Sequence, residues 1–173
     1  MPDLERATPD FLDSAPQRVV TEATVSAPID AVWSLLVDQA SWVQWFDAMT
    51  SVEASPWIWS QPGQTRKVTV NGFKVSEAAI AVDQEEEYAF TITNWPLPTA
   101  VRAAEAVRVA DRTDGGAAQT LITYIGAFEP TALGKRLGGV LEKQLIGAWG
   151  PAFVQLGELA NARRSDTGAP THG

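Results

Sequence analysis

Five polar side chains occupy positions in the sequence that are otherwise apolar. Alternate residues of a strand share a face, and four strand-like segments carry one polar residue in the same series as Val, Ile, Ala or Phe. A fifth polar residue lies in the apolar arc of a helical segment. The five are Arg66, Tyr88, Glu105, Tyr124 and Gln144. If these series face a cavity, their side chains could orient a ligand, or move protons and stabilise an enolate.

Arg66 and Glu105 are predicted to pair, because a buried charge is costly unless an opposite charge compensates it. Two alternatives stay open. Arg66 begins its strand and could extend toward solvent. Glu105 could lie on the outer face of the sheet, because Ala104 and Ala106 on the other side of the same strand also suit a core. The sequence therefore leaves the polarity of the expected pocket open.

Several kinds of catalytic site lack the residues that they need. The chain has no cysteine, and its single histidine, His172, is the penultimate residue. This excludes a thiol nucleophile and argues against a Ser-His-Asp triad or a histidine-based metal site. The glycine-rich segment 134–139 lacks the GK[ST] ending of a P-loop, and the acidic run 85–87 is interpreted as a solvated turn. We expect no cofactor and no bound metal.

Tryptophan is abundant, with seven residues in 173. Ordinary core packing is the simplest interpretation of each one. The alternative is a place at the rim of a cavity, where aromatic rings offer flat apolar surfaces to rings and acyl chains. Trp95, in a Pro-rich loop, is the best candidate for a rim or a lid. Trp149, on the C-terminal helix, is also retained as a candidate ligand contact.

Length and charge limit the class of protein. A chain of 173 residues, 45% hydrophobic and 20% charged, suits one globular domain. A net charge of −8 and a pI near 4.6 argue against a nucleic-acid binder and against attraction to an anionic membrane. No apolar run is long enough to be inserted in a membrane, and the acidic start lacks the apolar region of a signal peptide. The expected location is the cytoplasm.

These side chains must be positioned by a chain whose pattern changes from strand to helix and back. A strand is predicted for 18–26, then a helix over 28–38 and a short helix over 41–46. Alternating segments between residues 51 and 128 predict a series of antiparallel strands. Within it, Asn71-Gly72 is the strongest signal for a two-residue hairpin turn.

A long amphipathic helix is predicted for 133–159, where apolar residues recur every three or four positions. Pro151 lacks the N–H that would bond to the carbonyl of Gly147. We expect a kink between these two residues, because the apolar stripe keeps its phase across them. The alternative is two helices, the second beginning at Pro151.

The order of the elements is β-α-α-β(6)-α, which indicates an α+β fold. Residues 1–17 are predicted to be a flexible N-terminal arm, although Phe11 and Leu12 could dock on the domain. The domain itself is predicted to span 18–162. The polar segment 163–173 is predicted to be a disordered tail.

The sequence resembles a known superfamily at both ends of this domain. The opening consists of the strand end Val25-Ser26-Ala27-Pro28, a helix with Val32-Trp33 and Asp38, and then Trp42 and Trp45; the ending is Phe128-Glu129-Pro130 followed by a helix with Gly147-Ala148-Trp149 and Leu156. These motifs resemble the START-like (SRPBCC) superfamily, in particular its bacterial polyketide cyclase/dehydrase and lipid-transport branch. The resemblance implies a helix-grip fold, in which a bent antiparallel sheet wraps around a long C-terminal helix and encloses a deep apolar cavity. Its motif residues look structural, not catalytic.

Such a fold leaves function open, and three hypotheses follow. The preferred one is binding of a small hydrophobic ligand (a lipid, polyketide or aromatic compound) in the cavity. The second is a polyketide aromatase/cyclase, which should show at least two polar groups with shifted pKa values converging in the cavity. The third is a protein-partner binding module that uses the outer sheet or the loose arms, and it could have a collapsed cavity and an exposed apolar patch instead. The expected partner is a small hydrophobic molecule, and a homodimer is left open.

Overall fold

The computed structural model describes residues 3–113 and 115–167. Its elements follow the predicted order, preceded by one short helix and with a short 3-10 helix, η1, after the first long one. They are α1 Phe11–Ser14, β1 Gln17–Val25, α2 Ile29–Val37, η1 Gln39–Ser41, α3 Trp42–Trp45, β2 Met49–Ser55, β3 Thr65–Val70, β4 Phe73–Asp83, β5 Glu87–Asn94, β6 Ala100–Asp111, β7 Thr120–Pro130 and α4 Ala132–Thr167.

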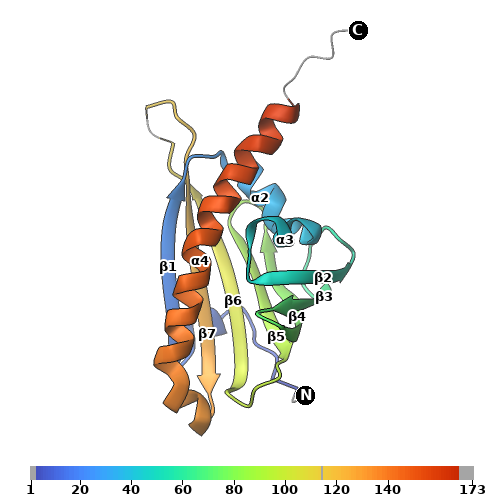
Figure 1. Ribbon diagram of the computed structural model, residues 1–173, viewed down its shortest axis with the longest axis vertical. Coiled ribbons are helices and arrows are strands. Elements are labelled where there is room, and N and C mark those ends of the chain that lie inside the picture. The colour runs from blue at the N-terminus through green and yellow to red at the C-terminus, as the bar shows by residue number, and fades with distance from the viewer. Residues whose placement is uncertain (1–2, 114, 168–173) are drawn as a thin grey trace.

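The strands form one antiparallel sheet in the order β1-β7-β6-β5-β4-β3-β2. Between β1 and β2 the chain crosses from one edge of the sheet to the other through α2, η1 and α3. Figure 1 shows α4 lying against the concave face of the curved sheet. The helices α2 and α3 pack against α4. This is the helix-grip arrangement, and the predicted α+β class is confirmed.

The hairpin between β3 and β4 turns at Asn71-Gly72, as predicted. Both residues have positive φ, 49° and 80°, the backbone that a tight two-residue turn requires and that Asn and Gly tolerate best. Val70 pairs with Phe73 across this turn, and the register continues without a bulge to the pair Arg66 and Glu77. The turn thus fixes which side chain lies opposite Arg66.

The C-terminal helix α4 is one continuous helix with Pro151 in its interior. The alternative of two separate helices is therefore wrong. The helix also extends to Thr167, so the predicted disordered tail is wrong for residues 163–167, while 168–173 lie outside the described residues. Within the described part of the chain, no helix combines the length and the apolar character that crossing a membrane requires.

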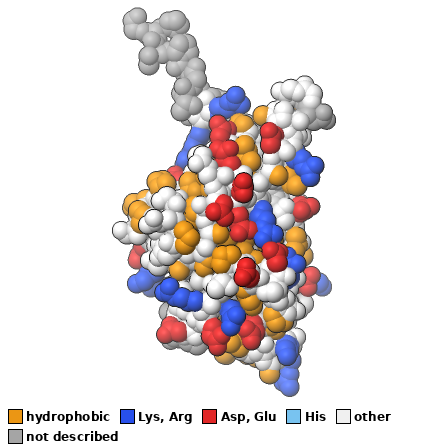
Figure 2. Space-filling model, turned by 180° about the vertical axis from the view of Figure 1, so that it is seen from behind, with side chains coloured by type: hydrophobic (Ala, Val, Ile, Leu, Met, Phe, Trp, Pro, Cys, Tyr) orange, Lys and Arg blue, Asp and Glu red, His pale blue; other side chains and the backbone are white. Residues whose placement is uncertain are grey.

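Residues 3–17 differ from the flexible arm that we expected, because they are docked on the outer face of the sheet. Ala7, Phe11 and Leu12 are buried there against small residues of β5, β6 and β7: Ala89, Ala104, Ala106 and Ala127. Ion pairs from Glu5 to Arg102 and from Asp13 to Arg108 hold the edges of the segment. Figure 2 shows this side of the molecule, where basic and acidic side chains alternate around apolar ones.

Candidate functional site

A cavity of about 450 Å³ lies between the inner face of the sheet and α4. Its walls come from the inner face of the sheet, from α3 and α4, and from residues 95–99 of the loop between β5 and β6. Most of the lining is apolar and includes Phe46, Val75, Phe90, Ile92, Leu97 and Leu145. The exposed lining residues Asn71, Phe73 and Gln144 mark where it opens to solvent.

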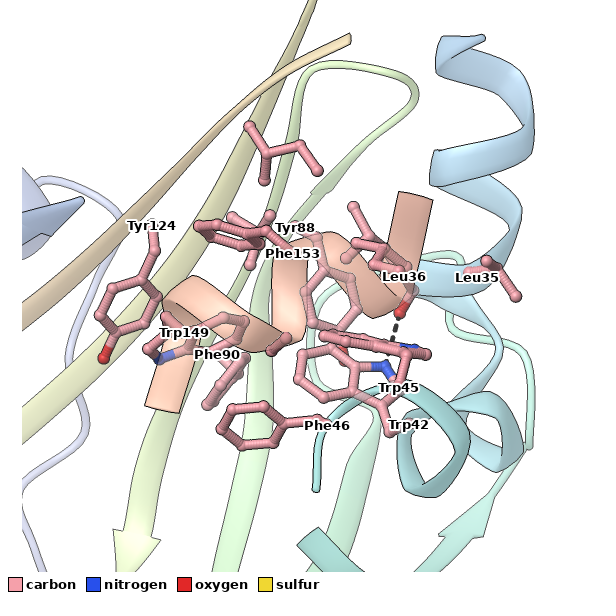
Figure 3. Packing of buried hydrophobic residues seen from close by; sticks show 14 of the residues in the cluster. Leu35, Leu36, Trp42, Trp45, Phe46, Tyr88, Phe90, Tyr124, Trp149 and Phe153 are labelled. Carbon is pink, nitrogen blue, oxygen red and sulfur yellow. Dashed lines mark hydrogen bonds between the residues drawn. The ribbon is translucent and has the colours of Figure 1, made fainter. Parts of the chain in front are cut away.

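An aromatic cluster forms one wall of this cavity (Figure 3). The ring of Trp149, on α4, stacks between those of Tyr124 and Phe46, with centroids 4.3 and 4.7 Å away. Trp42 packs against Trp45 at 4.5 Å, and its indole N–H donates to the carbonyl of Leu36 at 3.0 Å. These contacts join α2, α3, α4 and β7 and leave Trp42 and Trp149 almost fully buried. The wall is therefore rigidly packed.

Arg66 lies next to this wall, with a fully buried side chain. Its Nε donates to Oε2 of Glu77 at 2.5 Å, and its Nη1 donates to Oε1 of Gln39 at 2.8 Å. The guanidinium carbon lies 4.1 Å from the ring centroid of Trp42 and 4.9 Å from that of Phe90. Aromatic faces attract a desolvated cation. Arg66 is thus enclosed in a cage and does not extend to solvent.

The pairing predicted for Arg66 is wrong, since its partner is Glu77 and not Glu105. Burial raises the pKa of Glu77, and the charge of Arg66 opposes that rise. A guanidinium keeps its proton in proteins, so its charge favours an ionised Glu77 at this distance, and the two form a buried ion pair. The hairpin register contained the signal: a two-residue turn at 71–72 places residue 66 opposite residue 77.

Glu105 lies on the inner face of β6 and lines the cavity. Its neighbours Ala104 and Ala106 face the other way, toward the docked N-terminal segment, which resolves the alternative about its orientation. Burial raises the pKa of Glu105 to about 8, and the negative charge of Glu77 adds to this rise, whereas Tyr124 and Arg66 oppose it. The group therefore keeps its proton at neutral pH and can donate a hydrogen bond.

The two predicted tyrosines face inward, but neither lines the cavity. The Tyr88 hydroxyl donates to Oε1 of Gln39 at 3.0 Å, and its ring stacks on Trp59. The Tyr124 hydroxyl is buried and makes no well-formed hydrogen bond to a described residue, but it lies close enough to Glu105 to lower the pKa of that carboxyl. It lies beside Gly126, where an added Cβ would come within 2.8 Å of it. Burial raises the pKa of both hydroxyls, so both stay protonated.

Gln39 and Trp42 were not predicted as site residues. The amide N–H of Gln39 donates to the Val37 carbonyl, which turns its oxygen toward Arg66 and Tyr88. Asp38 holds the turn in place by accepting from the Ala40 N–H. A buried glutamine just after a helix gives no periodic signal, so only the three-dimensional structure brings it to the site.

The remaining candidates, Trp95, Gln144 and Trp149, all line the cavity. Gln144 is exposed at the mouth, and Trp149 belongs to the buried wall. The indole N–H of Trp95 donates to the Thr99 hydroxyl at 3.1 Å, and its ring lies 6.0 Å from that of Phe73. Trp95 therefore belongs to the rim.

The rim loop is fastened to the start of α4. The Thr131 N–H donates to the Thr99 carbonyl at 3.0 Å, and the Thr131 hydroxyl donates to the Pro98 carbonyl at 2.7 Å. Gly134 makes this contact sterically feasible, because a Cβ there would lie 1.8 Å from the Thr99 oxygen. The loop and the first turn of α4 therefore behave as one unit.

The docked N-terminal segment also reaches the cavity. Pairing between β5 and β6 stops at Thr91 and Ala104, and residues 3–5 enter the space beyond that point. The Leu4 N–H donates to the Thr93 carbonyl and the Glu5 N–H to the Val101 carbonyl, at 3.0 and 2.9 Å. The Leu4 side chain lines the cavity and belongs to the inner core. The segment thus seals a gap between two strands.

Solved structures of three other proteins resemble this fold. XoxI from Bacillus cereus has a TM-score of 0.65 at 18% identity, and the match covers 84% of this chain and 94% of that one. The Zhui aromatase/cyclase from Streptomyces sp. R1128 has a TM-score of 0.61 at 17% identity, covering 91% and 98%. Ara h 8.0201 has a TM-score of 0.58 at 15% identity, covering 84% and 98%. At these identities the likeness concerns the fold alone.

Comparison with curated protein sequences gives no match. A family match is nevertheless clear, since the family described as "Polyketide cyclase / dehydrase and lipid transport" matches residues 16–160. The match covers most of the chain and spans the sheet, the cavity wall and most of α4. The chain therefore belongs to the polyketide cyclase/dehydrase and lipid-transport family, as its motifs predicted.

Proposed function

We propose that this protein binds a small hydrophobic molecule, of the lipid, polyketide or aromatic class, in the cavity between the sheet and α4. The observation that carries the proposal is the cavity itself, about 450 Å³ of space with largely apolar walls and the Glu105 carboxyl among its lining. Pockets of roughly 300–1,000 Å³ with such a lining are the usual sites for organic ligands. The partner-binding hypothesis is less well supported, because the cavity is open and not collapsed by large side chains.

A second candidate function is that of a polyketide aromatase/cyclase. Two observations favour it: Glu77 and Glu105 both line the cavity, and burial raises the pKa of Glu105 to about 8. A carboxyl that is protonated near neutral pH can act as a general acid toward a carbonyl or enolate oxygen. Arg66 would not touch the substrate in this arrangement, because its side chain is enclosed. It would instead hold Glu77 in position.

Native mass spectrometry of freshly purified protein tests the binding proposal. Ala148 lies on α4 and lines the cavity, whereas Ala162 on the same helix is exposed. We expect a co-purifying or added hydrophobic compound to remain bound to the wild type and to Ala162→Phe, and to be lost from Ala148→Phe, whose ring fills the cavity. Equal retention by all three proteins would place the ligand outside the cavity. Failure of the wild type to bind any of a panel of lipids, aromatic compounds and polyketide mimics would overturn the proposal.

A second experiment separates a binding protein from a cyclase. A linear poly-β-ketone mimic that binds and is then converted to an aromatic ring, with loss of water, would support the cyclase. The conversion should fall in Glu105→Gln, which retains the shape of the side chain but cannot supply its proton. A mimic that binds and is recovered unchanged would support a binding protein and would count against the cyclase.

A further inference from the structure

The charges that line the cavity limit the ligands that it can take, provided that the cavity is the binding site proposed above. Four ionisable side chains occur among the described residues of the lining, namely Arg66, Glu77, Glu105 and Glu142. Three are acidic, one is basic, and no lysine or histidine is among them. A ligand that carries a negative charge would need a cation that is free to meet it.

Arg66 is not free in this sense. Its side chain has no exposed surface, its Nε and Nη1 are bonded to Glu77 and Gln39, and Trp42 and Phe90 cover its faces. The third nitrogen, Nη2, has no hydrogen-bond partner among the described residues, but it too is buried and has no accessible surface. The positive charge is compensated by Glu77, and the guanidinium offers no accessible surface to a ligand.

Glu105 is the carboxyl that a ligand can reach. It is partly exposed although it lies on the inner face, so its free surface is in the cavity. The charged and titratable groups around it are Arg66 on β3, Glu77 on β4 and Tyr124 on β7. On α4, the ionisable residue of the lining is Glu142, which is exposed at the mouth.

We propose that the cavity selects uncharged ligands that present a hydrogen-bond-accepting oxygen, such as a ketone or an ester, to Glu105, and that it excludes carboxylates and other anions. A protonated carboxyl donates one hydrogen bond to such an oxygen. An anion in the same place would be desolvated with no free cation to compensate its charge, which is strongly unfavourable. Free fatty acids are therefore poor ligands, and their esters or ketone analogues are better ones.

Three naphthalene fluorophores of one scaffold test this selection. The first is propionyl dimethylaminonaphthalene, a neutral ketone whose emission shifts to longer wavelength when its carbonyl accepts a hydrogen bond. The second is dimethylaminonaphthoate, in which a carboxylate replaces the ketone. The third is dimethylaminonaphthalene, which lacks both. We expect the ketone to bind the wild type at pH 7 at least about tenfold more tightly than the carboxylate, since an unpaired buried anion is costly.

Variants of Glu105 assign the selection to this residue. Glu105→Leu should weaken binding of the ketone about fivefold to tenfold, to the level of the compound without the carbonyl, and should abolish the emission shift. Glu105→Gln keeps an N–H donor and should retain most of the ketone affinity. The affinity of the wild type should fall between about pH 6 and pH 9, because the ionised carboxylate can no longer donate, and Glu105→Gln should show no such fall. Glu158→Gln, an exposed site on α4, is the matched control and should behave as the wild type.

The possible failures are distinct. If the carboxylate binds as tightly as the ketone, or if Glu105→Leu leaves the ketone affinity unchanged, the selection is overturned and the proposed binding function stands. If none of the three fluorophores binds the wild type, this inference is overturned, and the panel of lipids, aromatic compounds and polyketide mimics decides the proposed function. If all three bind Ala148→Phe as well as the wild type, the cavity is not the binding site. The proposed function and this inference are then both overturned.

Discussion

The guanidinium of Arg66 and the carboxylate of Glu77 lie directly opposite each other on β3 and β4, 2.5 Å apart and both buried. Removing one member of a buried ion pair leaves the other desolvated and uncompensated, at a cost of about 3–5 kcal/mol. We therefore predict that Arg66→Met and Glu77→Met each lower the free energy of unfolding by about that amount. The double variant should lose much less than the sum.

Urea unfolding of the four proteins gives this coupling energy directly. Asp13→Asn is the control, because its ion pairs with Arg18 and Arg108 are largely exposed; it should change the free energy of unfolding by less than about 1 kcal/mol. Additive losses in the double variant would show that Arg66 and Glu77 do not stabilise the fold as a pair.

The two buried tyrosines should respond differently to the same substitution. Tyr88→Phe removes a hydrogen bond to Gln39 and should lower the free energy of unfolding by about 1 kcal/mol. Tyr124→Phe removes a buried hydroxyl that lies near Glu105 and Trp149 but makes no well-formed hydrogen bond, so it should be neutral or slightly stabilising. Thermal unfolding of both variants measures the contrast. An equal loss in both would mean that the Tyr124 hydroxyl has a bonding partner after all.

Gly134 tests how tightly the rim loop is joined to α4. In Gly134→Ala the new Cβ would overlap the Thr99 carbonyl oxygen, so the loop or the helix start must move. Overpacking of this kind typically costs about 1–3 kcal/mol. Gly139→Ala, on the same helix, meets nothing within 4 Å and should instead stabilise the protein by about 0.5–1 kcal/mol through helix propensity. Denaturant unfolding of the two variants compares them, and a neutral Gly134→Ala would contradict the tight contact.

Leu4 tests the seal that the N-terminal segment makes between β5 and β6. Leu4→Ala deletes a buried side chain that lines the cavity, and it should lower the free energy of unfolding by about 2 kcal/mol. A probe bound in the cavity should also dissociate faster, because the gap beside Thr93 is less well closed. Arg6→Ala, at an exposed position in the same segment, should change neither quantity. Equal dissociation rates in stopped-flow experiments would show that the segment does not close the cavity.

The pKa of Glu105 predicts how stability depends on pH. Its value of about 8 in the folded protein lies above the ordinary 4.5, so the folded state binds more protons than the unfolded state between these values. The stabilisation from protonated Glu105 is complete below about pH 4.5 and is lost as pH rises to about 8. Glu105→Gln cannot ionise, so its free energy of unfolding should decline less over this range. Parallel pH profiles for the two proteins would contradict the raised pKa.

Local patterns in the sequence predicted most of the fold. Asn71-Gly72 specified the hairpin through backbone sterics, and the three-to-four spacing of apolar residues specified α4, because both signals act over a few neighbouring residues. The prediction was weakest for β6. Both faces of this strand are buried, one against the cavity and one under Phe11 and Leu12. Its alternation therefore could not tell which face held Glu105.

The site was predicted less completely, for a physical reason. Arg66 was placed on an inward face by its strand pattern, but its partners came from distant elements: Gln39 after α2 and Glu77 on β4. A buried polar group is stabilised by whichever residues the fold brings within hydrogen-bond distance. When these residues come from distant elements, no regular spacing in the sequence identifies them. The register from residues 71–72 was the exception, since it alone would have placed Glu77 opposite Arg66.

The most direct test of the account is a crystal structure of the protein bound to the neutral ketone fluorophore. The account predicts electron density for the naphthalene ring inside the cavity, in contact with Phe90, and the carbonyl oxygen within hydrogen-bond distance of the Glu105 carboxyl. An empty cavity, with the fluorophore on the exposed apolar residues Leu137 and Val140 of α4, would contradict it.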